Sequence, residues 1–173
     1  MSVSMYENSV TVFVRYLDNL SAILTKAAAH CVTKEIDESV LINARLYPDM
    51  LPLTRQVHIA CGVITAGLAR LAGLEFPSNE GEDITFVELQ ERIARAKQYL
   101  LAVPADQIDG TEDKLVTLVA GPNKEFKFPG KSYLSLWALP NVYFHITTTY
   151  NILRHNGVEL GKWDFLGSFE NGL

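Results

Sequence analysis

Residues 10–32 read VTVFVRYLDNLSAILTKAAAHCV, and apolar side chains recur in this stretch at steps of three and four. Because an α-helix has about 3.6 residues per turn, that spacing places the apolar side chains on one side of a helix. The members of this stripe are Val10, Phe13, Leu17, Leu20, Leu24, Ala27 and Cys31. The stretch predicts a long amphipathic helix that ends near Val32, preceded by the capping-box pattern of Ser4 and Glu7.

A short helix and a second long helix are predicted next. Asp37 has a side chain that caps many helices, and it precedes a short helical segment that runs from 38 to about 46. Asp49 is a second candidate cap, ahead of a longer helix that runs to about 71. Pro52 is acceptable in the first turn of that helix, since its missing N–H would have no partner there.

The third long helix has signals at both of its ends. Residues 75–83 contain Pro, Ser, Asn and Gly and predict a loop, which follows a helix-ending glycine, Gly73. Thr85 and Glu88 then form a capping box, and Pro104 marks the stop. The apolar stripe of this helix consists of Phe86, Leu89, Ile93, Ala96 and Leu100.

The periodicity changes after the third helix. Residues 115–120 and 125–128 are short β-prone runs on either side of Gly121-Pro122-Asn123. Two such runs around turn-forming residues predict a small β-hairpin. This hairpin is the only strand structure that we expect in the chain.

A last helix is expected from about Ser132 to Asn156, with Gly157 just behind its end. Pro140 lies inside this span and predicts a kink or a fresh start, because proline removes one backbone hydrogen bond. Four long amphipathic helices with a hairpin before the last favour an all-α four-helix bundle. We expect it to form a single domain that comprises residues 1–173. The loops are long enough for a crossover connection.

The composition excludes several classes of protein. The chain has 173 residues with 15 Lys+Arg and 20 Asp+Glu, and its net charge of −5 argues against nucleic acid as a partner. No apolar run approaches the roughly 20 residues that cross a membrane, and the first residues lack a signal-peptide pattern. Cys31 and Cys61 suggest neither a disulfide framework nor a thiolate zinc site, and they fit a cytoplasmic protein.

Histidines are the main candidates for chemistry, because nucleophile, phosphate-loop and H-E-x-x-H motifs are absent from the sequence. His58 lies in the middle of the second long helix. On the last helix, Asn141 and His145 are four residues apart and share one face. Two histidines and an amide are an incomplete set for zinc, so a hydrogen-bonded core and an inward-facing polar site both stay open.

Four runs of the sequence resemble the DinB/YfiT-like superfamily, and within it a bacterial branch. They are NARLYPDM at 43–50, LTRQV at 53–57, FHITTTYNILRH at 144–155 and LGKWDFLG at 160–167. The resemblance implies a four-helix bundle with a crossover connection and frequent homodimers. It also implies a divalent-metal site of three histidines, one on the second helix and an H-x-x-x-H pair on the last.

By this resemblance, His58 and His145 match two of the three metal ligands, while Asn141 stands where the first histidine of the pair is expected. The implied site for zinc or nickel therefore consists of His58, Asn141 and His145. An Asn141→His replacement would complete the triad, and the resemblance predicts that it raises metal affinity at least tenfold, or about 1.4 kcal/mol.

Two functions follow as hypotheses. In the first, the protein is a metal-dependent hydrolase or thiol transferase, whose ion lowers the pKa of a bound water or thiol. Contacts to an unidentified small-molecule substrate are expected from Thr54, Arg55, Thr148 and Tyr150, with Arg55 suited to a carboxylate. In the second, the protein is a non-catalytic, dimeric binding module that has lost the metal, and its histidines form a hydrogen-bonded network.

A homodimer is also expected from the number of apolar positions outside the stripes. Phe13 with Tyr16 and Trp137 with Tyr143 are examples that a small bundle would not fully cover. The alternative is that these rings fill the core of one chain, with the tyrosine hydroxyls on polar partners.

Overall fold

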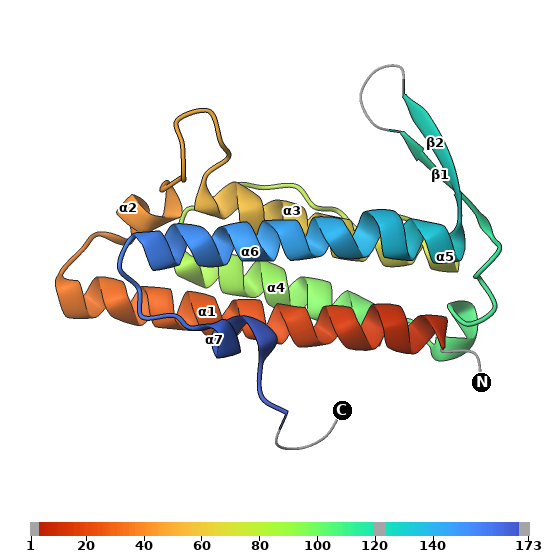
Figure 1. The fold of residues 1–173 in the computed structure, drawn as a ribbon, viewed down its shortest axis with the longest axis horizontal. Helices are drawn as coiled ribbons and strands as arrows, with labels where there is room; N and C mark the ends of the chain where they lie inside the picture. The colour runs from red at the N-terminus through yellow and green to blue at the C-terminus, as the bar shows by residue number, and fades with distance from the viewer. Residues whose placement is uncertain (1–3, 120–123, 170–173) are drawn as a thin grey trace.

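Long helices form a bundle with a β-hairpin at one end in the computed structural model, which describes residues 4–119 and 124–169 (Figure 1). The long helices are α1 (Val12–Lys34), α3 (Leu53–Ala72), α4 (Phe86–Leu101) and α6 (Leu139–His155). The short helices are α2 (Glu38–Ile42), α5 (Gly130–Tyr133) and α7 (Lys162–Leu166), the 3₁₀ turn η2 (Ala105–Gln107) and the π-helical turns η1 (Glu7–Thr11) and η3 (Leu134–Ala138). The strands are β1 (Leu115–Val119) and β2 (Glu125–Pro129).

The order of the helices includes a crossover. α1 and α6 run in one direction and α3 and α4 in the other, so the consecutive helices α3 and α4 are parallel (Figure 1). The chain must therefore return along the length of the bundle between them. We call the returning segment, residues 73–85, the crossover. The predicted four-helix bundle with a crossover connection is confirmed.

The start of the first helix is capped by a residue far away in the sequence. The Glu7 N–H donates to Ser4 Oγ at 3.1 Å, which is one half of the predicted capping box. Asp109 accepts from the Tyr6 N–H at 2.9 Å and from the Ser4 hydroxyl at 2.8 Å. These hydrogen bonds hold the pKa of Asp109 below its ordinary value. The helix end is thus fixed by the loop after α4.

The segment between α2 and α3 differs from the prediction. Asp37 caps α2 as expected, accepting from the Ser39 N–H at 2.9 Å, but α2 ends at Ile42 and not near 46. α3 begins at Leu53 behind Pro52, and Asp49 lies in a turn and caps nothing. The reason is a long-range hydrogen bond: the Leu53 N–H donates to the Ala44 carbonyl at 2.9 Å and closes the loop between the helices.

The predicted signals around α4 are confirmed. Gly73 ends α3 in the left-handed conformation, with φ of 74°. The Glu88 N–H donates to Thr85 Oγ1 at 3.1 Å, and the Thr85 N–H donates to Glu88 Oε2 at 2.9 Å, which completes the capping box. The Ile84 N–H also donates to Glu88 Oε2, at 2.8 Å, and this bond, together with those from Thr85, lowers the pKa of Glu88.

The last helix changes its winding next to the proline. α5, η3 and α6 follow one another without a gap, and the π-helical turn η3 directly precedes Leu139 and Pro140. Proline has no N–H to donate to the preceding turn, and the i→i+5 pairing of a π-helix accommodates the missing bond. Gly157 ends the helix with φ of 91°, as predicted. The short helix α7, by contrast, was not predicted.

The hairpin is antiparallel and pairs Val116 with Phe128 and Leu118 with Phe126. Among the described residues it is the only strand structure, as the sequence predicts. Ala120 and the predicted turn residues at 121–123 lie outside them. Within the described part of the chain, no helix is long and apolar enough to cross a membrane.

Aromatic rings that suggested a dimer are used inside one chain. The Phe13 side chain is fully buried, and the Tyr16 ring packs against Tyr143 at 4.9 Å and Phe165 at 5.3 Å between centroids. Trp137 stacks on Phe126 at 6.4 Å. The homodimer stays a prediction, but these rings no longer argue for it.

The crossover packs directly on α3 at a glycine. A Cβ atom at Gly62 would overlap the side-chain amide of Asn79. Asn79 in turn accepts a hydrogen bond from Arg92 Nη1 at 2.7 Å, so its side chain is held in place. The absence of a side chain at Gly62 lets the crossover approach the helix.

We predict that Gly62→Ala destabilises the protein by about 1–3 kcal/mol, because the added methyl group overpacks this contact. The measurement is the free energy of unfolding in urea. Gly67→Ala is the matched control on the same helix, since its added Cβ would meet Ala138 and Tyr133 only at ordinary distances of 3.7 and 3.8 Å. That control is expected to be neutral or stabilising. Equal stability of the two variants would contradict the prediction.

Candidate functional site

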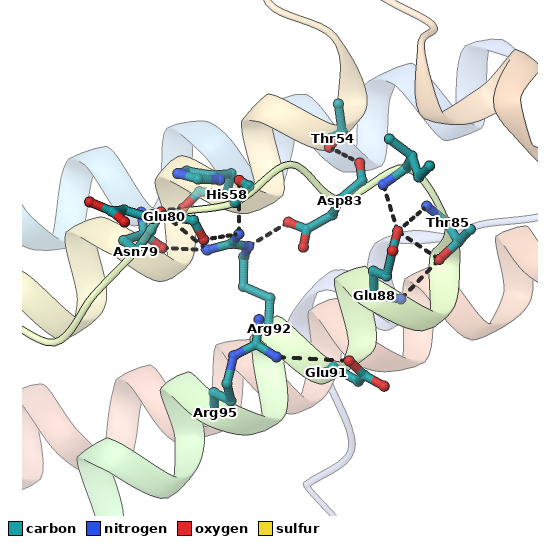
Figure 2. A network of polar contacts seen from close by, with 12 residues as sticks. Thr54, His58, Asn79, Glu80, Asp83, Thr85, Glu88, Glu91, Arg92 and Arg95 are labelled. Atoms are coloured by element: carbon teal, nitrogen blue, oxygen red, sulfur yellow. Dashed lines mark hydrogen bonds and ion pairs between the residues drawn. The ribbon is translucent and has the colours of Figure 1, made fainter.

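Arg92 connects the crossover to α4. Its side chain is almost fully buried, and its Nε donates to the equally buried carboxylate of Asp83. Nη2 donates to the Glu80 carbonyl at 3.1 Å and the Gly81 carbonyl at 3.3 Å, and Nη1 donates to Asn79 Oδ1 at 2.7 Å. Figure 2 shows the guanidinium between the crossover and α4, with these acceptors around it. One arginine therefore fixes residues 79–83.

Thr54 holds the same segment from α3. Its hydroxyl donates to the Asp83 carbonyl at 2.7 Å (Figure 2). Thr54 is one of the predicted substrate-binding residues, and its hydroxyl proton is used in this contact. The structure thus gives Thr54 a positioning role at the end of the crossover.

The crossover forms one wall of a cavity of about 480 Å³, which we call the trough. Its floor is one face of α3, and its opposite wall comes from β1 and from the helical turns around η3. The floor residues are Ile59, Gly62, Val63 and Ala66, with Arg55, His58 and Arg70 toward the ends of this face. The wall residues are Phe76, Pro77 and Asn79 on the crossover side and Leu118, Tyr133 and Trp137 on the other.

The trough has basic side chains and no carboxylate among its described lining residues. Arg55 is exposed, and its side chain makes no hydrogen bond or ion pair with the described part of the chain. Arg70 lies over the ring of Phe76 at 4.7 Å, and its Nη1 donates to Tyr133 Oη at 3.3 Å. Arg55 and Arg70 are 15 positions apart, or about 22 Å along the axis of α3. A ligand in the trough can therefore pair with an arginine at either end of it.

His58 lies between the trough and a second cavity of about 220 Å³ on the other side of Arg55. Burial lowers the pKa of His58, and the charges of Arg92 and Arg55 lower it further, while Asp83 opposes them. The imidazole is therefore mostly neutral at pH 7. In this state it adds hydrogen-bonding capacity to the trough and no charge.

His145 contacts a different side of α3. Its Nδ1 lies 2.8 Å from Oε1 of Gln56. Since Gln56 Nε2 donates to the Leu51 carbonyl at 3.1 Å, the oxygen of the amide faces His145, and we assign the ring proton to Nδ1. Burial lowers the pKa of His145, which keeps the ring neutral. Gln56 was not predicted as a partner.

The three predicted metal ligands lie on two helices, and two of them have other hydrogen-bond partners. Gln56 and His58 are two positions apart on α3, so their side chains leave the helix about 160° apart, and His145 is on the Gln56 side. Asn141 donates from Nδ2 to the Trp137 carbonyl at 2.7 Å, within its own helix. The described residues contain no group of three or more His, Cys, Asp or Glu side chains placed to hold a metal ion. The three-ligand metal site stays a prediction, and Asn141 and His145 would each have to leave a present hydrogen bond to form it.

Two other predicted substrate-binding residues lie away from the trough. The Thr148 hydroxyl donates to the Phe144 carbonyl of its own helix at 2.7 Å. The Tyr150 hydroxyl donates to the Leu160 carbonyl at 3.4 Å and so contacts the C-terminal segment. Of the four predicted residues, Arg55 alone lines the trough.

The cysteines do not supply a nucleophile near neutral pH. Cys61 is buried, and burial raises the pKa of its thiol to about 12. Burial also raises the pKa of Cys31, with help from the nearby Glu38 and Asp37. Both groups stay thiols at pH 7, whereas the reactive form of cysteine is the thiolate.

We predict that Asn141→His does not raise the affinity for zinc or nickel, because His58 projects from another side of α3. The measurement is calorimetric titration of each metal into the wild type and the variant, both without a polyhistidine tag. His58→Gln in the same background is the control. A tenfold gain in metal affinity that His58→Gln abolishes would contradict this prediction and support the three-ligand metal site.

Comparisons with known proteins agree with the fold. The family model described as "Domain of unknown function (DUF1993)" matches residues 5–166. A search of curated proteins gives no significant match. Among solved structures, the chain is similar to a DinB family member protein from Shewanella denitrificans, with 38% identity and a TM-score of 0.87. That match covers 95% of this chain and 93% of the other. The chain therefore belongs to the DUF1993 family and, as its sequence motifs indicate, to the DinB-like four-helix bundles.

Proposed function

We propose that this DinB-like protein is a binding module for small organic anions, with the trough as its site. The observation that supports this most strongly is the charge of the trough. Two arginines, Arg55 and Arg70, line it without a described carboxylate, although the chain as a whole carries a net charge of −5. A local positive potential in an acidic protein attracts and orients anions.

The free guanidinium of Arg55 is the expected anchor. Its planar, paired N–H groups match the two oxygens of a carboxylate, and such a charge-assisted pair is stronger than a neutral hydrogen bond. Arg70 is already engaged with Phe76 and Tyr133, so it contributes a fixed charge and its remaining donors. The apolar floor on α3 is suited to contact the uncharged part of the ligand.

A metal-dependent hydrolase or thiol transferase is the competing function. It is supported by the family resemblance, and it requires that His58, Asn141 and His145 coordinate the same metal ion. Their separate contacts favour the binding module, as do the two protonated cysteines. The two free, buried thiols are compatible with the proposed cytoplasmic location. A homodimer is compatible with this proposal but is not required by it.

We predict that Arg55→Gln lowers the affinity for an organic carboxylate at least tenfold, since it removes the charged partner. The probes are 2-naphthoate and decahydro-2-naphthoate, each compared by calorimetry with the corresponding neutral amide. Arg154→Gln, which removes the same charge from the exposed end of α6, is the matched control. If both variants bind the acids equally, or if the amides bind as tightly as the acids, the proposal is wrong.

A further inference from the structure

We infer that the anion bound in the trough has a flat aromatic body, so that the ligand class is the aromatic carboxylates. This inference rests on the proposed function and adds the chemistry of the uncharged part of the ligand. It is carried by the aromatic rings on both walls of the trough and by the Arg70 guanidinium over one of them, Phe76.

The crossover wall presents an uncovered ring. Phe76 is 59% exposed although it lines a cavity, and its only described ring partner is the guanidinium of Arg70 at 4.7 Å. An exposed phenylalanine beside a cavity leaves apolar surface in water that a ligand would cover. The guanidinium above the ring is planar and weakly hydrated, and it stacks on aromatic faces as well as pairing with anions.

The opposite wall ends a series of stacked rings. Phe128 lies 6.3 Å from Phe126, and Phe126 lies 6.4 Å from Trp137, with an angle of 30° between the planes in each pair. Trp137 is the member of this series that lines the trough, together with Tyr133. The hairpin thus packs against the indole through Phe126.

The floor between the two walls is mainly apolar. Ile59, Val63 and Ala66 follow one another at helical spacing on α3, without a described charged group between them. A flat ring placed against Phe76 or Trp137 gains stacking there, and next to Arg70 it gains cation–π attraction, in addition to burial of its surface. A saturated body of the same carbon skeleton gains burial alone. The charge at Arg55 then sets the end at which the carboxylate lies.

The test compares 2-naphthoate with decahydro-2-naphthoate, which share a carbon skeleton and a carboxylate and differ in aromaticity. Calorimetry should give 2-naphthoate about a tenfold advantage. Trp137→Leu and Phe76→Leu should each reduce this advantage at least threefold without weakening the saturated acid. Trp163→Leu, which removes an indole that is 70% exposed on α7, is the control and should leave the advantage unchanged.

The outcomes separate this inference from the proposed function. Equal, Arg55-dependent affinity for the two acids would overturn the aromatic preference and leave anion binding in place. An advantage that survives both Trp137→Leu and Phe76→Leu would also overturn it, since the walls would not be its source. Binding of neither acid would remove both proposals. Because Phe76 lies on an exposed part of the crossover, its variant tests the inference even where Trp137→Leu unfolds the hairpin contact.

Discussion

The buried ion pair of Arg92 and Asp83 is the contact on which the crossover and the trough both depend. Parallel α3 and α4 require thirteen residues, 73–85, to return along the bundle, and this segment has no regular secondary structure of its own before the cap of α4. Burying a charged pair costs several kcal/mol unless its remaining donors and acceptors are satisfied. Here the guanidinium also reaches Asn79, Glu80 and Gly81, so the pair is compatible with burial.

The same contact decides the properties of the site. It holds Asn79 against Gly62, and thereby keeps Phe76 and Pro77 beside α3 as a wall of the trough. Its charges also reach His58, whose pKa Arg92 helps to lower. The wall, the floor and the protonation state of the central imidazole are therefore linked through one arginine, although Arg92 itself does not line the trough.

Local signals predicted most of the fold. The caps at Asp37 and Thr85 and the glycine at 73 act through neighbouring residues, so the sequence reveals them directly. The prediction failed at Asp49: α3 begins behind Pro52, and the loop before it closes through the Leu53 N–H and the Ala44 carbonyl. The start of the first helix keeps half of its predicted capping box, and it depends in addition on a carboxylate more than a hundred positions away.

The site was predictable only in part, because it is assembled from distant segments. The sequence indicates Arg55 from its place on the second long helix. Phe76 and Trp137 line the same cavity only because the crossover and η3 fold against that helix, which the sequence does not reveal. One signal was available for Arg92, since it falls three positions after Leu89 and so interrupts an apolar stripe with a charge.

The metal triad was transferred by resemblance. The sequence predicts a kink at Pro140 but does not reveal the π-helical turn before it. Asn141 lies in the first turn of α6, and its amide donates to the Trp137 carbonyl in that π-helical turn. The asparagine therefore has a structural explanation within its own helix.

Proteolysis of the crossover tests the central claim most directly. The segment exposes Glu80 and Glu82 to a glutamate-specific protease, and Arg92 holds the Glu80 and Gly81 carbonyls beside these sites. Arg92→Lys keeps the charge but lacks the planar donors that reach several acceptors at once. Cleavage of the native protein there should be about tenfold faster in Arg92→Lys than in the wild type or in Arg95→Lys, since local opening becomes easier. Equal cleavage rates in all three proteins would contradict the account.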